Sequence, residues 1–213
     1  MNITKHGHCC LTLKIGSLTI LTDPGNYNTC PLESGIDIIL ITHEHQDHCH
    51  LDALQIVLAK NPEAEIITHK GVGKLLDEVG IAWTEVSSGE AISRKGVAIK
   101  SIGSEHACIH HDLTPVQNTG FLIADQLFYP GDSFELPLVS VDILALPVAG
   151  PWMKLSEAIE YTKEVKPKKV FPVHDGMLRQ EHQLGPTRRI PTILLEPFGI
   201  EYIDMQEGDI KEF

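Results

Sequence analysis

Short apolar runs alternate with turn residues over the first 60 positions of the chain. Residues Cys9–Ile15 and Ser17–Thr22 are rich in Leu, Ile and Thr and meet at Gly16, a pattern that predicts a hairpin. The run Ile36–Ile41 is almost entirely apolar, which is typical of a buried strand. Leu51–Lys60 carries apolar residues at helical spacing, so we expect an amphipathic helix directly after that strand.

The remainder of the chain shows the same kinds of pattern. Further strands are expected at Glu65–Thr68, Ile81–Val86, Val97–Ile102, Val141–Leu146, Val170–Val173 and Ile200–Asp204. A second hairpin is expected at Thr119–Ala124 and Gln126–Tyr129. Helices are expected at Val72–Val79, Leu155–Val165 and Arg188–Glu196, the last with Pro191 in its first turn.

The order of hairpin, strand and helix occurs twice, in residues 9–60 and again in residues 119–165. Two such halves predict an α/β fold in which two sheets pack face to face with helices outside. No Gly/Ser-rich or Pro-rich linker divides the chain, and 213 residues suffice for one sizeable core. We therefore expect a single domain over residues 1–213.

Charge and cysteine content narrow the possible partners. The formal net charge is −12, which disfavours binding to nucleic acid, whereas a small anionic substrate remains compatible with bound cations. The five cysteines are odd in number and irregularly spaced, so no disulfide framework is expected. The chain shows neither a signal-like N-terminus nor an apolar run of about 18 residues. We expect no membrane span, a cytoplasmic location and a small-molecule partner, with a homo-oligomer left open.

The stretch Thr42–His48 reads T-H-E-H-Q-D-H and follows directly on the first buried strand. Three imidazoles and a carboxylate at the end of such a strand are typical of a metal site at the mouth of a sheet. His43 and His45 are two positions apart, so in an extended segment they point to the same side. Asp47 and His48 lie where the chain turns towards a helix and can face a second ion. One ion would not use all four groups, so the motif predicts two metals.

Three later strand ends carry partners for this motif. His106 would supply the third imidazole of the first ion. Asp132 lies in a Pro-Gly-Asp turn, and we expect its carboxylate to bridge the two ions, because adjacent cations need an anion between them. His174 would join Asp47 and His48 at the second ion. The alternatives are an ordinary loop histidine and an Asp that only shapes its turn.

These motifs, in this order over nearly the whole chain, resemble the metallo-β-lactamase superfamily. The segments Gly7–Cys10, Leu18–Gly25 and Ala145–Met153 resemble the branch that includes ascorbate-6-phosphate lactonase-like and N-acylphosphatidylethanolamine phospholipase-D-like proteins and many unassigned hydrolases. The resemblance implies an αββα four-layer sandwich with a binuclear metal site on one edge. It also implies that the carboxylate of Asp23 orients a ligand histidine, the alternative being a turn cap before Pro24.

Carried over to this sequence, the resemblance assigns every ligand. The first metal takes His43, His45 and His106, the second takes Asp47, His48 and His174, and Asp132 stands between them. We expect two divalent ions, with zinc first and manganese or iron as alternatives.

The expected activity is metal-dependent hydrolysis. A hydroxide held between the two ions would attack an ester or lactone of a small metabolite, which can carry phosphate, and a phosphodiester is the second choice. Asp47 is the expected catalytic residue, which orients the nucleophile and passes a proton to the leaving group. His8, His110 and His111 are candidate substrate contacts, against core packing for His8 and a solvated loop for the other two.

Two other functions remain as alternatives. The first is an iron-dependent dioxygenase or redox protein of the same fold, although His45 stands where the di-iron, oxygen-reducing members of the superfamily carry Glu. The second is a metal-binding protein without catalysis, which the complete ligand set disfavours.

Overall fold

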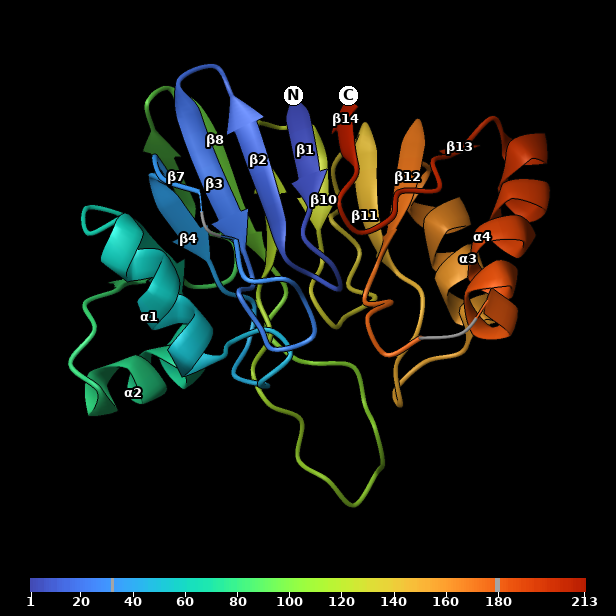
Figure 1. Cartoon of the computed structure of the whole chain (residues 1–213). Coiled ribbons are helices and arrows are strands. Elements are labelled where there is room, and N and C mark those ends of the chain that lie inside the picture. Colours follow the sequence, from blue (N-terminus) through green and yellow to red (C-terminus); the bar gives the residue numbers. More distant parts are fainter. Residues whose placement is uncertain (32, 179–180) are drawn as a thin grey trace.

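In the computed structural model, which describes residues 1–31, 33–178 and 181–213, the chain forms two mixed β-sheets that lie face to face (Figure 1). Helices α1 (Leu51–Lys60) and α2 (Lys70–Glu78) cover one sheet, and α3 (Leu155–Val165) and α4 (Glu181–Leu195) cover the other. The expected αββα sandwich is confirmed. None of the helices within these described ranges is long and apolar enough to span a membrane.

Within the described residues, each sheet has seven strands. In spatial order, the first contains β14 (Ile210–Glu212), β1 (Asn2–Lys5), β2 (Leu11–Ile15), β3 (Leu18–Thr22), β4 (Ile38–Leu40), β5 (Glu65–Thr68) and β6 (Thr84–Glu85). The second contains β13 (Glu201–Tyr202), β12 (Lys169–Val173), β11 (Ile143–Pro147), β10 (Leu127–Tyr129), β9 (Gly120–Ile123), β8 (Val97–Ile102) and β7 (Ala91–Arg94).

The two sheets repeat one order of elements. In the first, β2 and β3 pair antiparallel, β3 and β4 pair parallel, and α1 follows β4. In the second, β9 and β10 pair antiparallel, β10 and β11 pair parallel, and α3 follows β11. The expected repetition of hairpin, strand and helix is therefore confirmed. Because β5 and β12 extend the parallel part of each sheet, the loops after these strands gather at one edge.

Apolar side chains fill the space between the sheets and beneath both helix pairs. Successive residues of a strand point to opposite faces. In β3, Ile20 packs between the sheets, whereas Leu21 packs under α1 and α2. In β12, Phe171 packs between the sheets, whereas Val170 packs under α3 and α4. Burial on both faces explains why the inner strands have continuous apolar sequences.

Three short strands at or near the sheet edges, β1, β7 and β14, are not predicted by the sequence. β14 is exposed at every position, and β7 has no fully buried residue. Strands of this kind lack the apolar run by which the inner strands are recognised. The stretch that contains β7 reads as turn-rich, and its strand character depends on pairing with β8.

Helix α4 begins at Glu181, well before the expected start at Arg188. Pro191 lies inside the helix, where it cannot donate to the carbonyl of Thr187 one turn earlier. The hydroxyl of Tyr202 donates to that carbonyl at 2.7 Å instead. The prediction that Pro191 lies in the first turn was wrong, because a side chain of β13 supplies the hydrogen bond that proline removes.

The two ends of the chain lie side by side (Figure 1). β14 pairs antiparallel with β1, the amino group of Met1 donates to the carbonyl of Phe213 at 2.9 Å, and the N–H of Phe213 donates back at 2.9 Å. At the opposite edge, the segment 103–119 between β8 and β9 extends away from the sheets (Figure 1).

Candidate metal centre

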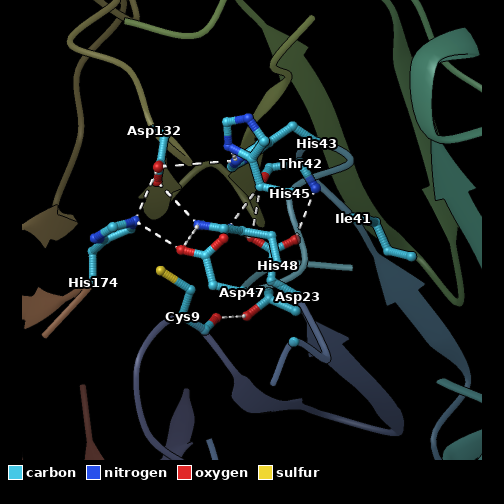
Figure 2. Close-up of polar contacts among 12 residues, drawn as sticks. Cys9, Asp23, Ile41, Thr42, His43, His45, Asp47, His48, Asp132 and His174 are labelled. Carbon is cyan, nitrogen blue, oxygen red and sulfur yellow. Dashed lines mark hydrogen bonds and ion pairs between the residues drawn. The ribbon is translucent and has the colours of Figure 1, made fainter. Parts of the chain in front are cut away.

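All seven predicted ligands follow strands of the two sheets and lie at one edge of the sandwich. Figure 2 labels all of them except His106. The first sheet contributes His43, His45, Asp47 and His48 after β4; the second contributes His106 after β8, Asp132 after β10 and His174 after β12. The fold thus brings together side chains that are distant in sequence and come from both halves of the chain.

The segment that carries the first four of these residues is a turn. The N–H groups of His48 and Cys49 both donate to the carbonyl of His45, at 2.9 and 2.8 Å. These hydrogen bonds place a turn at residues 45–49, where the chain was expected to turn towards a helix. His43 Nε2 and His45 Nδ1 approach to 3.0 Å, so the two imidazoles point to a common place.

Asp132 lies in the middle of the imidazoles. Its Oδ2 is 2.9 Å from His174 Nε2 and 3.3 Å from His106 Nε2. Its Oδ1 is 3.2 Å from His48 Nε2, and His43 Nε2 lies 3.9 Å from Oδ2. Burial would raise the pKa of Asp132, but the His48 and His174 rings hold that pKa well below its usual value. One carboxylate therefore contacts imidazoles of both predicted ligand sets.

The donor atoms of this cluster fit metal ions. His48 Nε2, His174 Nε2 and Asp132 Oδ1 are buried and have no hydrogen-bond partner. Burying a polar atom without a hydrogen-bond partner is energetically unfavourable, so the convergence of these three atoms indicates a site for a ligand. His43, His45, His106 and Asp132 each offer a ligand atom within 4.8 Å of the others. Imidazole with carboxylate is a donor set that zinc, manganese and iron accept.

Burial favours the neutral, metal-binding form at three imidazoles of the cluster. Burial would also lower the pKa of His48, but the Asp132 carboxylate holds that pKa well above its usual value. Burial holds the pKa of His43 well below the usual value and lowers that of His45. It lowers the pKa of His8 to about 4, against the opposing effect of Asp47.

Asp47 lies between His8 and the second pair of imidazoles. Its Oδ2 is 3.2 Å from His8 Nε2, 3.6 Å from His174 Nε2 and 3.9 Å from His48 Nε2. Burial would raise the pKa of Asp47, but the hydrogen bond with His8 and the neighbouring imidazoles lower it. Its side chain is 21% exposed, so this carboxylate borders both the cluster and the open space above it.

The thiol of Cys9 was not among the predicted groups. Its sulfur lies with ring nitrogens of His8, His48 and His174, all within 4.8 Å of one another. Burial raises the pKa of this thiol to about 12. Because Cys9 precedes β2 and carries no recognisable spacing to a second ligand, the sequence offered no sign of its place.

Asp23, after β3, holds the turn that carries the ligands. Its Oδ1 accepts the Thr42 N–H at 2.8 Å, and its Oδ2 accepts the Thr42 hydroxyl at 2.8 Å and lies 2.7 Å from His48 Nδ1. This contact agrees with the expected role of orienting a ligand histidine. Asp23, His8 and His174 all have positive φ angles, 36°, 47° and 60°. Such strained backbone is common at functional sites.

Three supporting side chains were missed by the sequence reasoning. The Tyr129 hydroxyl contacts Asp23 Oδ2 at 2.5 Å and the Cys9 carbonyl at 3.0 Å. The Trp152 indole N–H donates to Asp132 Oδ2 at 2.9 Å. His69 donates from Nε2 to the Thr42 carbonyl at 2.9 Å and accepts from the Gly71 N–H at Nδ1.

His69 could have been found from the internal repetition. It follows β5 in T-H-K-G, just as His174 follows β12 in V-H-D-G, and β5 and β12 occupy matching places in the two halves. The sequence signal for Trp152 is weaker and consists only of its place in a Gly-Pro-Trp turn. In the structure, a Cβ at Gly150 would lie 2.8 Å from the indole nitrogen.

The remaining candidates lie in different surroundings. His8 is buried beside Asp47, and its Nδ1 accepts the Gly176 N–H at 3.0 Å. His110 and His111 are exposed in the segment 103–119, where both lie close to Asp112, 3.6 and 3.4 Å away. Their neighbour Ile109, and not these histidines, lines the cavity over the cluster.

That cavity has a volume of about 310 Å³ and lies directly over the candidate metal centre. His45, Asp47, His106, Asp132 and His174 contribute to it, together with side chains from the loops around the centre. A small molecule in this cavity would therefore contact the same groups that converge on the buried donor atoms.

Comparison with known proteins agrees with this geometry. A family model described as beta-lactamase superfamily domain matches residues 2–174. A Mycobacterium tuberculosis protein, Rv0786c, is 34% identical over 185 residues, covering 84% of this chain and 85% of its own length. A metal-dependent hydrolase of Thermoplasma acidophilum is 29% identical over 189 residues, covering 82% and 83%.

A solved structure shares the fold over the whole chain. Igni18, a metallo hydrolase from Ignicoccus hospitalis, superposes with a TM-score of 0.76 at 20% identity, covering 100% of this chain and 98% of its own.

Proposed function

Because this chain belongs to the beta-lactamase superfamily domain family and is a metal-dependent hydrolase, we propose that it uses two divalent ions to cleave an ester or lactone bond in a small molecule. Zinc is the first choice for both ions, since most of the donor groups are imidazoles. Manganese and iron suit the same donors.

The position of Asp132 supports the binuclear proposal most directly. Its Oδ1 faces His48, whereas its Oδ2 faces both His106 of the first predicted ligand set and His174 of the second. A carboxylate that contacts ring nitrogens of both sets would be shared by two bound ions. The unpartnered state of Oδ1 and His48 Nε2 leaves a lone pair free on each atom.

Bound ions would supply a hydroxide at neutral pH and positive charge beside the carbonyl oxygen. Asp47 orients the attacking water from the edge of the cavity, where His8 fixes its carboxylate through the 3.2 Å contact. The water oxygen ends on the acid product as the ester C–O bond breaks. Asp47 accepts the proton that the water loses and passes it to the leaving alcohol, while the other water proton stays with the acid product. Asp23 and Thr42 hold the ligand turn rigid during this change.

Replacing the bridging carboxylate tests the proposal. Asp132→Ala should lower the metal content from two ions per chain and reduce hydrolysis of para-nitrophenyl esters by more than about a hundredfold. Elemental analysis and a colorimetric assay measure both effects. Asp125→Ala, which removes an exposed carboxylate paired with Lys100 in the β9–β10 turn, is the matched control. Near-native turnover of the Asp132 variant, or full activity with one ion per chain, would contradict the binuclear proposal.

A further inference from the structure

The walls of the cavity over the metal centre are uncharged. They are formed by Tyr27, Ile109, Pro151, Trp152 and Met177, with Asn26 and Gln46 as neutral polar groups. No Lys or Arg among the residues that the structure describes lines this cavity. Its ionised groups are the carboxylates of the candidate metal centre. Within the described part of the chain, the space beyond the reacting bond therefore offers apolar contact and no cation to pair with an anionic substituent.

Among the described residues, two basic side chains beside the neighbouring loops have acidic partners. Lys5 is buried, pairs with Asp175 at 2.7 Å and donates to two backbone carbonyls. Arg188 lines a separate neighbouring cavity of about 580 Å³ and pairs with Asp204 at 3.4 Å. That second cavity also contains the carboxylates of Asp175 and Glu207, so it too is a poor place for an anion.

The net charge of the chain also disfavours an anionic substrate. The chain carries a net charge of −12, which repels anionic molecules approaching from solution. Bound ions would offset this charge at the reacting bond.

We infer that the substrate is an uncharged ester or lactone whose group beside the scissile carbonyl is small and apolar, an inference that rests on the proposed hydrolytic function. The volume of about 310 Å³ is at the small end of ligand cavities, which suits a group of a few carbon atoms. Tyr27 and Ile109, each 43% exposed, are apolar surfaces that such a group would cover.

A series of esters tests the inference on the metal-loaded protein. From para-nitrophenyl acetate to propionate to butyrate, kcat/KM should rise about fourfold for each added methylene. Mono-para-nitrophenyl succinate has the shape of the butyrate ester but ends in a carboxylate. It should react at least about tenfold more slowly, since burying an unpaired charge is unfavourable. Equal or faster reaction of the succinate ester would overturn the inference.

A variant pair locates the selectivity in this cavity. Ile109→Lys places a cation on the cavity wall. It should lower the ratio of kcat/KM for the butyrate ester to kcat/KM for the succinate ester by about tenfold or more. Leu113→Lys is the matched control, because Leu113 is 58% exposed on the same segment but does not line the cavity. Equal effects of the two substitutions would overturn the inference.

Binding measurements separate this inference from the hydrolytic proposal. N-phenylbutyramide and N-phenylsuccinamate have the same two acyl groups on a slowly hydrolysed amide, and calorimetry measures their binding to the metal-loaded protein. Preference for the butyramide without cleavage of any ester would support an uncharged, apolar ligand for this cavity and refute ester hydrolysis. Ester cleavage with preference for the succinyl compounds would refute the substrate class and leave the hydrolytic function standing.

Discussion

The indole N–H of Trp152 and the imidazoles around it share one acceptor, the carboxylate of Asp132. Trp152 donates to Oδ2, the oxygen that also faces His106 and His174. Its ring packs edge-on against both histidines, with centroids 5.8 and 5.9 Å away. Hydrogen bonds of this kind orient a metal ligand before the ion arrives, and losing them typically weakens metal binding 10–100-fold. We therefore expect Trp152, like Asp23, to orient candidate ligands through its hydrogen bond.

Trp152→Phe keeps the apolar ring and removes the donor. We expect metal binding to weaken by about tenfold or more, measured by competition with a coloured chelator, while the melting temperature of the metal-free protein changes little. Trp83→Phe is the matched control, because its N–H donates to Asp77 near the surface, away from the centre. Unchanged metal affinity in the Trp152 variant would show that the indole serves only as a wall of the cavity.

At the scale of elements, the loop after β3 supports the turn after β4. The Asn26 N–H donates to the Gln46 carbonyl at 3.0 Å, and the His50 N–H donates to the Pro24 carbonyl at 3.2 Å. Gly25 lies so close that a Cβ there would be 1.8 Å from the Asp47 carbonyl oxygen. The glycine is thus required by the close approach of two backbones.

Gly25→Ala should push the two loops apart and misplace the ligand turn. A displacement of about 1 Å at a reacting centre can cost about a hundredfold in rate, so we expect a loss of hydrolysis between tenfold and a hundredfold. Gly16→Ala, in the β2–β3 hairpin, is the control. There the positive φ of 58° strains the alanine, but nothing lies within 4 Å, so stability should fall while activity per folded molecule is kept. Equal activity losses would refute the supporting role.

Part of the fold was predicted correctly from the sequence. The predicted bounds are confirmed for α1, α3, β5 and β8, because the spacing of apolar residues along each of these segments indicates which positions are buried. The candidate ligands were recognised because metal-binding residue types stand directly after apolar strands. Tyr129 and Trp152 were not, because their role depends on which strand end lies beside which. That proximity comes from sheet order, and no local spacing encodes it.

For the whole molecule, the candidate metal centre joins the two sheets. The turn after β4 belongs to the first sheet, whereas His106, Asp132 and His174 follow strands of the second. An ion held by residues of both sheets would be released when the sheets separate, so we expect metal binding to be linked to folding.

Removing the ions should therefore destabilise the protein. At a free metal concentration about 1,000 times Kd, binding to the folded state contributes about 4 kcal/mol. For a chain of this size that corresponds to roughly 8–16 °C in melting temperature, measured by calorimetry with and without a chelator. Adding zinc back should restore the original value. Asp132→Ala should show a smaller chelator-induced shift in melting temperature. Identical melting curves of the native protein with and without chelator would contradict a stabilising metal ion between the sheets.

The pairing of β1 with β14 makes a circular permutation of the chain feasible. Because Met1 and Phe213 are hydrogen-bonded to each other, a linker of a few residues can close the backbone into a ring. New ends can then be opened at the turn around Gly89, where the first sheet passes to the second and a Cβ would meet nothing within 4 Å. Such a circular permutant would begin with the half that carries Asp132 and end with the half that carries Thr42–His48, and the ligands would meet as they do here.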